Sequence, residues 1–186
     1  MVLKNAGVVF RIDHTEIDEK KLRAALAAKN MSPASIGHAL ATEKAKTVSL
    51  RPKNKDGLVI GADQMLVCEG RMFEKPEDLN AALRQLKALR GKTHTLLASA
   101  VIYRNGKRLF TIEDEARLAM RNFSDSFLET YLANVGERAL TRVGAYQLER
   151  EGAQLFRKID GDFFTILGLP LVPLLEFLRA SGFLAD

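Results

Sequence analysis

Several residue types that mark common protein classes are scarce in this chain or missing from it. There is one cysteine, Cys68, no tryptophan, and only three histidines among 186 residues. A lone cysteine excludes an intrachain disulfide and is typical of a reducing compartment, so we expect a cytoplasmic protein. The histidines lack the spacing of zinc ligands, which argues against a zinc site.

Long apolar runs are also missing. The longest run, residues 163–175, is interrupted by Gly168, Pro170 and Pro173, and it falls short of the ~20 residues that a spanning helix needs. No basic segment followed by an apolar core begins the sequence, so we expect neither a secretory signal nor a membrane passage. The chain is 47% hydrophobic and 27% charged, which is the composition of a globular domain.

The charge is unbalanced but not concentrated. A formal net charge of +5 predicts an affinity for anions, yet no block of lysine and arginine is interleaved with aromatic residues. A pocket for a polyanionic small molecule therefore explains the excess more simply than a nucleic-acid face. The sequence has no glycine-rich phosphate loop, Gly-x-Ser-x-Gly elbow or Cys–His pair, which argues against kinase, GTPase, dehydrogenase and esterase chemistry.

Strand and helix signals alternate irregularly, which predicts a mixed twisted sheet flanked by helices in a single domain, residues 1–186. The expected strands are residues 7–13, 58–62, a hairpin at 65–73, 93–103 and 107–121 joined by Asn105-Gly106, and parts of 145–166. The expected helices are residues 20–30, one from Pro33, one opened by Pro76, one capped by Ser124, and 170–180.

The candidate catalytic residues follow from this layout. Asp63 ends the apolar strand at 58–62, which is how α/β enzymes commonly present an acid at a sheet edge. Lys75 returns on the next connection and Lys44 lies on the helix from Pro33, so two ammonium groups are available for phosphates. Taken singly, Asp63 is equally compatible with a turn cap, whereas each lysine is more simply explained as a solvated surface residue.

Other polar residues have a functional and a structural interpretation. Asp18 and Glu19 offer carboxylates for a metal ion, or they simply begin a helix. Glu149 offers a contact to a base or ribose, or half of an exposed ion pair. His94 is most simply a structural hydrogen-bond donor.

Taken in chain order, these residues resemble the Maf family of nucleoside triphosphate pyrophosphatases. Each motif alone is weak, whereas the ordered series is specific. The matching segments are Ile17-Asp18-Glu19, Ala41-Thr42-Glu43-Lys44-Ala45, Ile60-Gly61-Ala62-Asp63, Glu74-Lys75-Pro76, Leu89-Arg90-Gly91-Lys92-Thr93-His94, Gly144-Ala145-Tyr146, Gly161 and Gly168-Leu169-Pro170-Leu171.

The resemblance implies a mixed α/β fold similar to that of inosine triphosphate pyrophosphatases, with two lobes around a cleft. It implies hydrolysis of a nucleoside triphosphate between the α- and β-phosphates. By analogy Asp63 is the catalytic acid/base or metal carboxylate, and Lys44 and Lys75 neutralise the triphosphate. Asp63 and Glu19 are the implied ligands of a divalent Mg²⁺ or Mn²⁺, and a homodimer is implied as well.

Two positions bear on the branch of the family. A threonine after the aspartate, with a later glutamine, marks the branch that acts on thymidine and uridine triphosphates. This chain has Gln64 and Glu149 there, which resembles the branch that prefers 7-methyl-GTP, so both are expected to bind substrate. A carboxylate accepts hydrogen bonds from guanine N1–H and the exocyclic amine, and it offsets the charge of a methylated ring.

One departure concerns the start of the chain. Maf proteins open with a strand and a Ser-x-Ser-x-Arg-Arg loop, whereas Met1-Val2-Leu3-Lys4-Asn5-Ala6-Gly7 matches the segment after that loop. Three explanations stay open: a start codon assigned too late, a truncated chain, or a degenerate member of the family. Without those phosphate-binding arginines we expect turnover to be impaired. Two alternatives to an active enzyme stay open: a nucleotide-binding or cell-division regulatory protein, and a basic nucleic-acid-binding domain.

Overall fold

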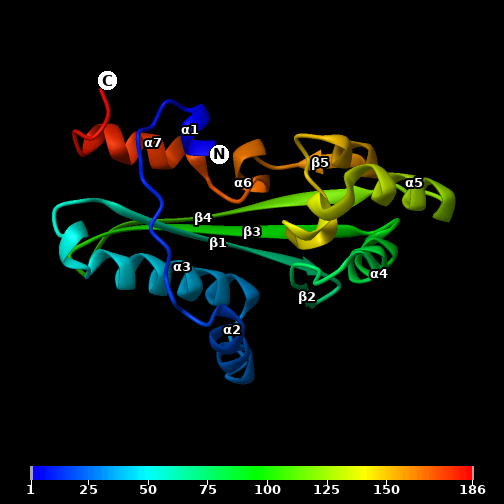
Figure 1. The fold of residues 1–186 in the computed structure, drawn as a ribbon, viewed down its shortest axis with the longest axis horizontal. Helices are drawn as coiled ribbons and strands as arrows, with labels where there is room; N and C mark the ends of the chain where they lie inside the picture. Colours follow the sequence, from blue (N-terminus) through cyan, green and yellow to red (C-terminus); the bar gives the residue numbers. More distant parts are fainter. Residues whose placement is uncertain (1, 186) are drawn as a thin grey trace. The chain divides into compact units, whose positions relative to one another are not determined.

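The structure, a computed structural model, describes residues 2–185 (Figure 1). It confirms the mixed α/β architecture, because helices accompany one sheet with strand order β2-β1-β3-β4-β5. The strands are β1 (Val59–Cys68), β2 (Arg71–Phe73), β3 (Thr93–Arg104), β4 (Lys107–Met120) and β5 (Phe156–Asp160). The α-helices are α1 (Val2–Asn5), α2 (Glu19–Ala28), α3 (Pro33–Ser49), α4 (Leu79–Leu89), α5 (Asp125–Val135), α6 (Phe163–Ile166) and α7 (Leu171–Ala180). The short 3-10 helices are η1 (Pro52–Asn54), η2 (Gly136–Leu140), η3 (Val143–Ala145) and η4 (Glu151–Leu155).

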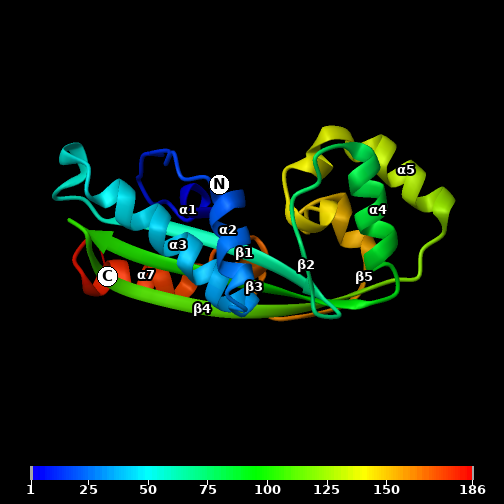
Figure 2. The same ribbon diagram turned by 90° about the horizontal axis from the view of Figure 1, so that it is seen from below.

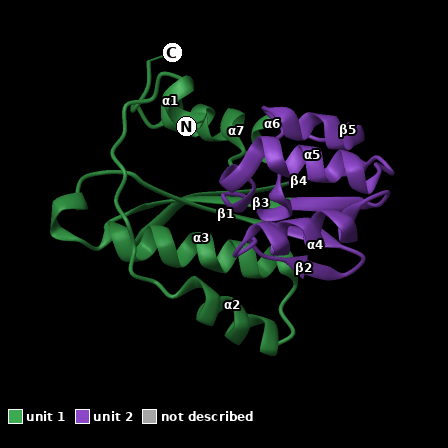
Figure 3. Ribbon diagram, turned by 45° about the vertical axis from the view of Figure 1, so that its right-hand side comes forward, with its two compact units in different colours: residues 1–64, 97–114, 162–186 green, residues 65–96, 115–161 purple. Residues whose placement is uncertain are grey.

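The chain divides into two compact units, coloured separately in Figure 3. Unit 1 comprises Met1–Gln64, Leu97–Asp114 and Asp162–Asp186, and unit 2 comprises Met65–Leu96 and Glu115–Gly161. The strands β1, β3 and β4 each begin in one unit and end in the other. The two units are therefore joined by continuous strands rather than by flexible linkers.

Unit 1 has a helix on each face of its part of the sheet, as Figures 1 and 2 show. On the α3 face, Ala41 and Ala45 pack against Val101 and Tyr103 of β3. Ile102, which lies between these two residues of β3, points the opposite way and packs against α7. This alternation along β3 is the period of two expected when a sheet is covered on both faces.

Local capping chemistry explains where the helices begin. Ser32 caps α3 as expected, since its hydroxyl accepts a hydrogen bond from the Ser35 amide at 3.2 Å. The helix expected to open at Pro76 instead begins at Leu79. Its cap is Asp78, whose carboxylate accepts from the Ala81 amide at 2.6 Å, so the proline lies outside the helix.

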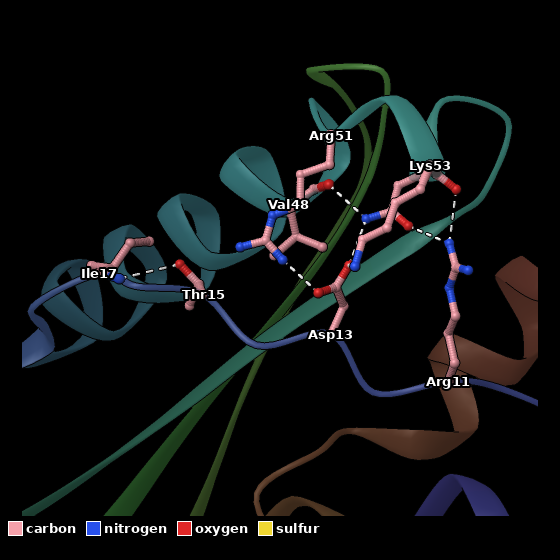
Figure 4. Close-up of polar contacts among 8 residues, drawn as sticks. Arg11, Asp13, Thr15, Ile17, Val48, Arg51 and Lys53 are labelled. Atoms are coloured by element: carbon pink, nitrogen blue, oxygen red, sulfur yellow. Dashed lines mark hydrogen bonds and ion pairs between the residues drawn. The ribbon is translucent and has the colours of Figure 1, made fainter.

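The expected strand at residues 7–13 is wrong. The segment runs extended without joining the sheet, because side chains hold it at the end of α3 (Figure 4). Asp13 is bonded to Arg51, to Asn54 at 2.9 Å and to Lys53 at 3.0 Å. Arg11 donates to the Lys53 carbonyl at 2.8 Å. The hydrogen bond from Asn54 and the neighbouring cations lower the pKa of Asp13 to about 2.

Two other expectations need correction. The apolar run at 58–62 and the first arm of the hairpin are one strand, β1, which turns at Glu69-Gly70 into β2. Within residues 145–166 the only strand among the described residues is β5, because 3-10 turns and α6 occupy most of the rest.

Unit 2 is built on α4, which packs against η2, η3 and α5. Cys68 ends β1 in this unit, is buried, and donates from Sγ to the Thr93 carbonyl at 3.7 Å. Burial raises the pKa of its thiol. No helix in the part of the chain that the structure describes has both the length and the apolar character needed to cross a membrane.

Candidate active site

A single ammonium group joins two carboxylates in unit 1. Lys44 Nζ on α3 donates to Asp63 Oδ1 on β1 at 2.7 Å and lies 2.8 Å from Glu19 Oε2. The Asp63 side chain is only 6% exposed, whereas that of Glu19 is 42% exposed. The cluster thus has one buried carboxylate, Asp63, and one that faces solvent, Glu19. It brings together three residues that the sequence predicts for the site.

A close contact between β1 and α3 brings Asp63 and Lys44 together. A Cβ at Gly61 would lie 2.3 Å from the Ala41 carbonyl oxygen and 2.8 Å from the Ala45 amide nitrogen. Only a residue without a side chain fits there, and small residues at 41 and 45 let the backbones approach. The motifs around Gly61 and Lys44 are therefore two halves of one packing arrangement.

The start of α2 supplies Glu19. Asp18 caps that helix, since its Oδ1 accepts a hydrogen bond from the Lys21 amide at 2.9 Å, which is the structural interpretation of this residue. Glu19 is the first helical residue, and α2 packs against α3. The capping geometry thus fixes where the second carboxylate meets Lys44.

Burial dominates the electrostatics of Asp63. Desolvation raises the pKa of its carboxyl above the ordinary value, although Lys44 and Arg23 act in the opposite direction. Its Oδ1 is held by Lys44, while its Oδ2 is buried and has no hydrogen-bond partner among the described residues. A buried acceptor of this kind costs free energy unless a ligand, a proton or water completes it.

The same atom bears on metal binding. Among the described residues no group of three or more histidine, cysteine, aspartate or glutamate side chains could enclose a metal ion. Mg²⁺, however, is commonly held by one or two carboxylates together with substrate phosphates. Asp63, through its unpartnered Oδ2, and Glu19 fit an ion that arrives bound to a triphosphate.

Gln64 faces away from this cluster. Successive side chains of a strand point to opposite faces, and Gln64 Nε2 donates to the carbonyls of Thr165 at 2.9 Å and Ile166 at 3.1 Å in α6. The Thr165 hydroxyl in turn donates to Asp114 at 2.6 Å. The structure therefore shows Gln64 binding the end of a helix, on the opposite face from Lys44.

The remaining predicted residues belong to unit 2. Lys75 is exposed beside the buried Pro76, and Glu149 is exposed in the turn that precedes η4. Both side chains are thus accessible to a ligand. Sequence reasoning missed Arg23, whose charge acts on Asp63; its position one helical turn after Glu19 is the signal that could have found it.

The fold and the cluster together define an α/β protein in which a lysine donates a hydrogen bond to a buried aspartate. Such an arrangement is suited to phosphate chemistry. The family described as Maf-like protein matches residues 1–181. The chain belongs to this family.

Similar relatives are close in both sequence and length. One is a nucleoside triphosphate pyrophosphatase of Paramagnetospirillum magneticum, 48% identical over 97% of this chain and 92% of the relative. Another is a 7-methyl-GTP pyrophosphatase of Rhizobium meliloti, 45% identical over 97% of this chain and 90% of the relative. A 7-methyl-GTP pyrophosphatase of Rhizobium etli is 46% identical over 98% of this chain and 90% of the relative.

Proposed function

We propose that this protein is a nucleoside triphosphate pyrophosphatase, a hydrolase that releases pyrophosphate and leaves the nucleoside monophosphate. The observation that carries the proposal is the state of Asp63. It is a buried carboxylate with a raised pKa, one oxygen held by Lys44 and the other without a partner. A carboxylate held in this way is suited to take a proton from an attacking water molecule.

Each charged residue has a distinct role in that reaction. Asp63 Oδ2 has two lone pairs, so it accepts the proton of the water that attacks phosphorus on one of them and leaves the other for a metal ion. Lys44 keeps the Asp63 carboxylate in place while it offsets its charge. Lys75 contributes a further positive charge for the triphosphate. In-line displacement at phosphorus depends on such positioning and charge neutralisation more than on a covalent nucleophile.

A divalent ion, Mg²⁺ or Mn²⁺, would be held by Asp63 and Glu19 together with the phosphates of the substrate. When bound, it supplies positive charge against the phosphate oxygens. The charges of Asp63, Glu19, Lys44 and Arg23 sum to zero, so the cluster supplies no net positive charge for a triphosphate. We therefore expect the nucleotide to bind with its metal ion rather than alone.

The proposed substrate is a guanine nucleotide of the 7-methyl-GTP kind. The support is Glu149, an exposed carboxylate that suits a positively charged methylated base, and the similarity to relatives named 7-methyl-GTP pyrophosphatase. Gln64 is the second proposed substrate-binding residue, and its amide nitrogen is already engaged with α6.

The test is pyrophosphate release from a panel that includes 7-methyl-GTP, GTP, dTTP and UTP, with Mg²⁺ or Mn²⁺. We expect Asp63→Asn to abolish release, while Asp56→Asn, which removes an exposed carboxylate in the same unit, leaves it intact. Equal rates on 7-methyl-GTP and dTTP would contradict the base assignment. Nucleotide binding without turnover would point instead to a regulatory, non-catalytic protein, and salt-sensitive retention of oligonucleotides unaffected by Asp63→Asn to a nucleic-acid binder.

Two other implications of the family stay predictions. Sedimentation of the purified chain checks the proposed homodimer. An in-frame Ser-x-Ser-x-Arg-Arg segment in the DNA upstream of Met1 would show that the family's phosphate-binding loop is encoded.

A further inference from the structure

Gln85 on α4 contacts two segments of unit 2 that are distant in sequence. Its Nε2 donates to the Glu74 carbonyl at 2.6 Å, and its Oε1 accepts a hydrogen bond from the Gly144 amide at 3.3 Å. Glu74 directly precedes Lys75, and Gly144 lies in η3, five residues before Glu149. One half-buried side chain thus connects the segments that carry the proposed phosphate and base contacts.

The chemistry of the partners fixes the orientation of this amide. The Glu74 carbonyl can only accept, so it must face the NH₂ group, and the Gly144 amide can only donate, so it must face the oxygen. A rotation of the amide by 180° would lose both hydrogen bonds at once. An ionised carboxylate has no donor for the Glu74 carbonyl, and a thioether has no donor either, so neither can replace both hydrogen bonds of the amide.

The segment that begins at Gly144 needs such support. Gly144 and Ala145 have φ values of 82° and 60°, and the left-handed region is strained for a residue such as Ala145. Side chains from two further elements hold it: the Tyr131 hydroxyl donates to the Ala145 carbonyl at 3.2 Å, and His94 Nε2 lies 2.7 Å from the Tyr146 hydroxyl. Gln85, Tyr131 and His94 thus all support this segment. Of these three side chains, Gln85 is the one that also bonds to the backbone at Glu74, next to Lys75.

We propose that Gln85 is a positioning residue that fixes the position of the Lys75 segment relative to the Glu149 segment. The inference rests on the proposed function, which gives those two side chains their roles on the triphosphate and the base. Gln85 acts through the backbone, by its hydrogen bonds at Glu74 and Gly144.

Two substitutions separate the two contacts. Gln85→Glu keeps an oxygen for the Gly144 amide but replaces the donor to Glu74 with an oxygen that repels its carbonyl. Gln85→Met keeps the length and helix propensity of the side chain but removes both hydrogen bonds. Gln154→Glu, at an exposed position of the same unit, is the control for the added negative charge.

The kinetic expectations differ between the variants. With Gln85→Glu we expect kcat/KM for the preferred triphosphate to fall about tenfold, the upper range for one lost hydrogen bond, because Lys75 is displaced. The ratio of kcat/KM between 7-methyl-GTP and GTP should not change. With Gln85→Met we expect the same fall together with a narrowing of that ratio, because the Glu149 segment is also released.

Several outcomes would overturn the proposal. One is a kcat/KM and a base ratio within twofold of the Gln154→Glu control for both variants. Another is an equal change of the base ratio in Gln85→Glu and Gln85→Met, since a merely structural loss of stability does not separate the two contacts.

Amide exchange supplies a readout that needs no turnover. We expect the Gly144 N–H to exchange faster in Gln85→Met than in the unaltered chain, and at the unaltered rate in Gln85→Glu. If the unaltered chain hydrolyses no nucleotide, the proposed function fails. The exchange rates then test the contact of Gln85 with Gly144 independently of activity. Equal Gly144 exchange rates in Gln85→Met and the unaltered chain would refute the positioning role of Gln85.

Discussion

Lys44 helps to set the pH range in which Asp63 is the proton acceptor. Burial raises the pKa of Asp63 and the ammonium of Lys44 lowers it, so removing that charge must raise the pKa further. Because the deprotonated carboxylate is the proton acceptor, activity should fall as the pH drops through this pKa. We expect Lys44→Met to reduce kcat/KM and to move the acidic limb of its pH profile to higher pH. An unmoved limb would show that another group sets it.

His94 makes stability depend on pH. Burial lowers its pKa from 6.5 to about 4, so the unfolded chain binds a proton in a range where the folded chain does not. Stability from this source is therefore intact above pH 6.5 and is lost as the pH falls toward 4, by about 3 kcal/mol in all.

The measurement is urea unfolding between pH 7 and 4.5 for the unaltered chain and for His94→Phe. The variant is expected to be less stable at pH 7, because it leaves the Tyr146 hydroxyl without its partner. Its stability should nevertheless vary less with pH across this window. Parallel pH dependences would rule out His94 as the source.

At the scale of elements, the contact between β1 and α3 is the feature on which the site depends. In Gly61→Ala the new methyl group would meet the Ala41 backbone, which cannot move aside as a flexible side chain can. We expect a loss of about 1–3 kcal/mol in unfolding free energy, and a large loss of activity because Lys44 and Asp63 are pushed apart. Gly57→Ala is the control, since its nearest atom lies 3.5 Å away. Equal effects of the two substitutions on activity would contradict this account.

Much of the element layout follows from local signals in the sequence. Ser32 and Ser124 cap helices as predicted, and Asn105-Gly106 turns between β3 and β4. The segment at 7–13 has the apolar pattern of a strand, but its hydrogen bonds come from side chains at the end of α3, and such long-range polar contacts leave no periodic signal.

The site was also predictable only in part, because sequence motifs identify residues but not the contacts they make in space. Asp63, Lys44 and Glu19 were identified by their motifs, and the structure brings them together. The opposite orientation of Gln64 follows from strand alternation once Asp63 is assigned, so the period of two could have shown it. The double contact of Gln85 could not have been predicted, because it depends on three segments meeting in space.

At the scale of the whole molecule, three strands belong to both units. We expect the units to unfold in one cooperative transition, because breaking β1, β3 or β4 in one unit removes strand pairing in the other. Hydrogen exchange under mild denaturant should show Val101 in unit 1 and Leu118 in unit 2 opening with the same free energy. Two separate transitions, or exchange of only one residue accelerated by Gly61→Ala, would contradict a shared unfolding step.

The buried thiol of Cys68 has a practical consequence. A sulfhydryl that is buried and has a raised pKa presents little thiolate, so it resists maleimides and disulfide reagents until β1 detaches from its neighbours. Because the sequence contains no other cysteine, the time course of its labelling directly reports how often this strand opens. Cys68 thus serves as a native labelling probe for conformational opening, and no cysteine has to be introduced for the purpose.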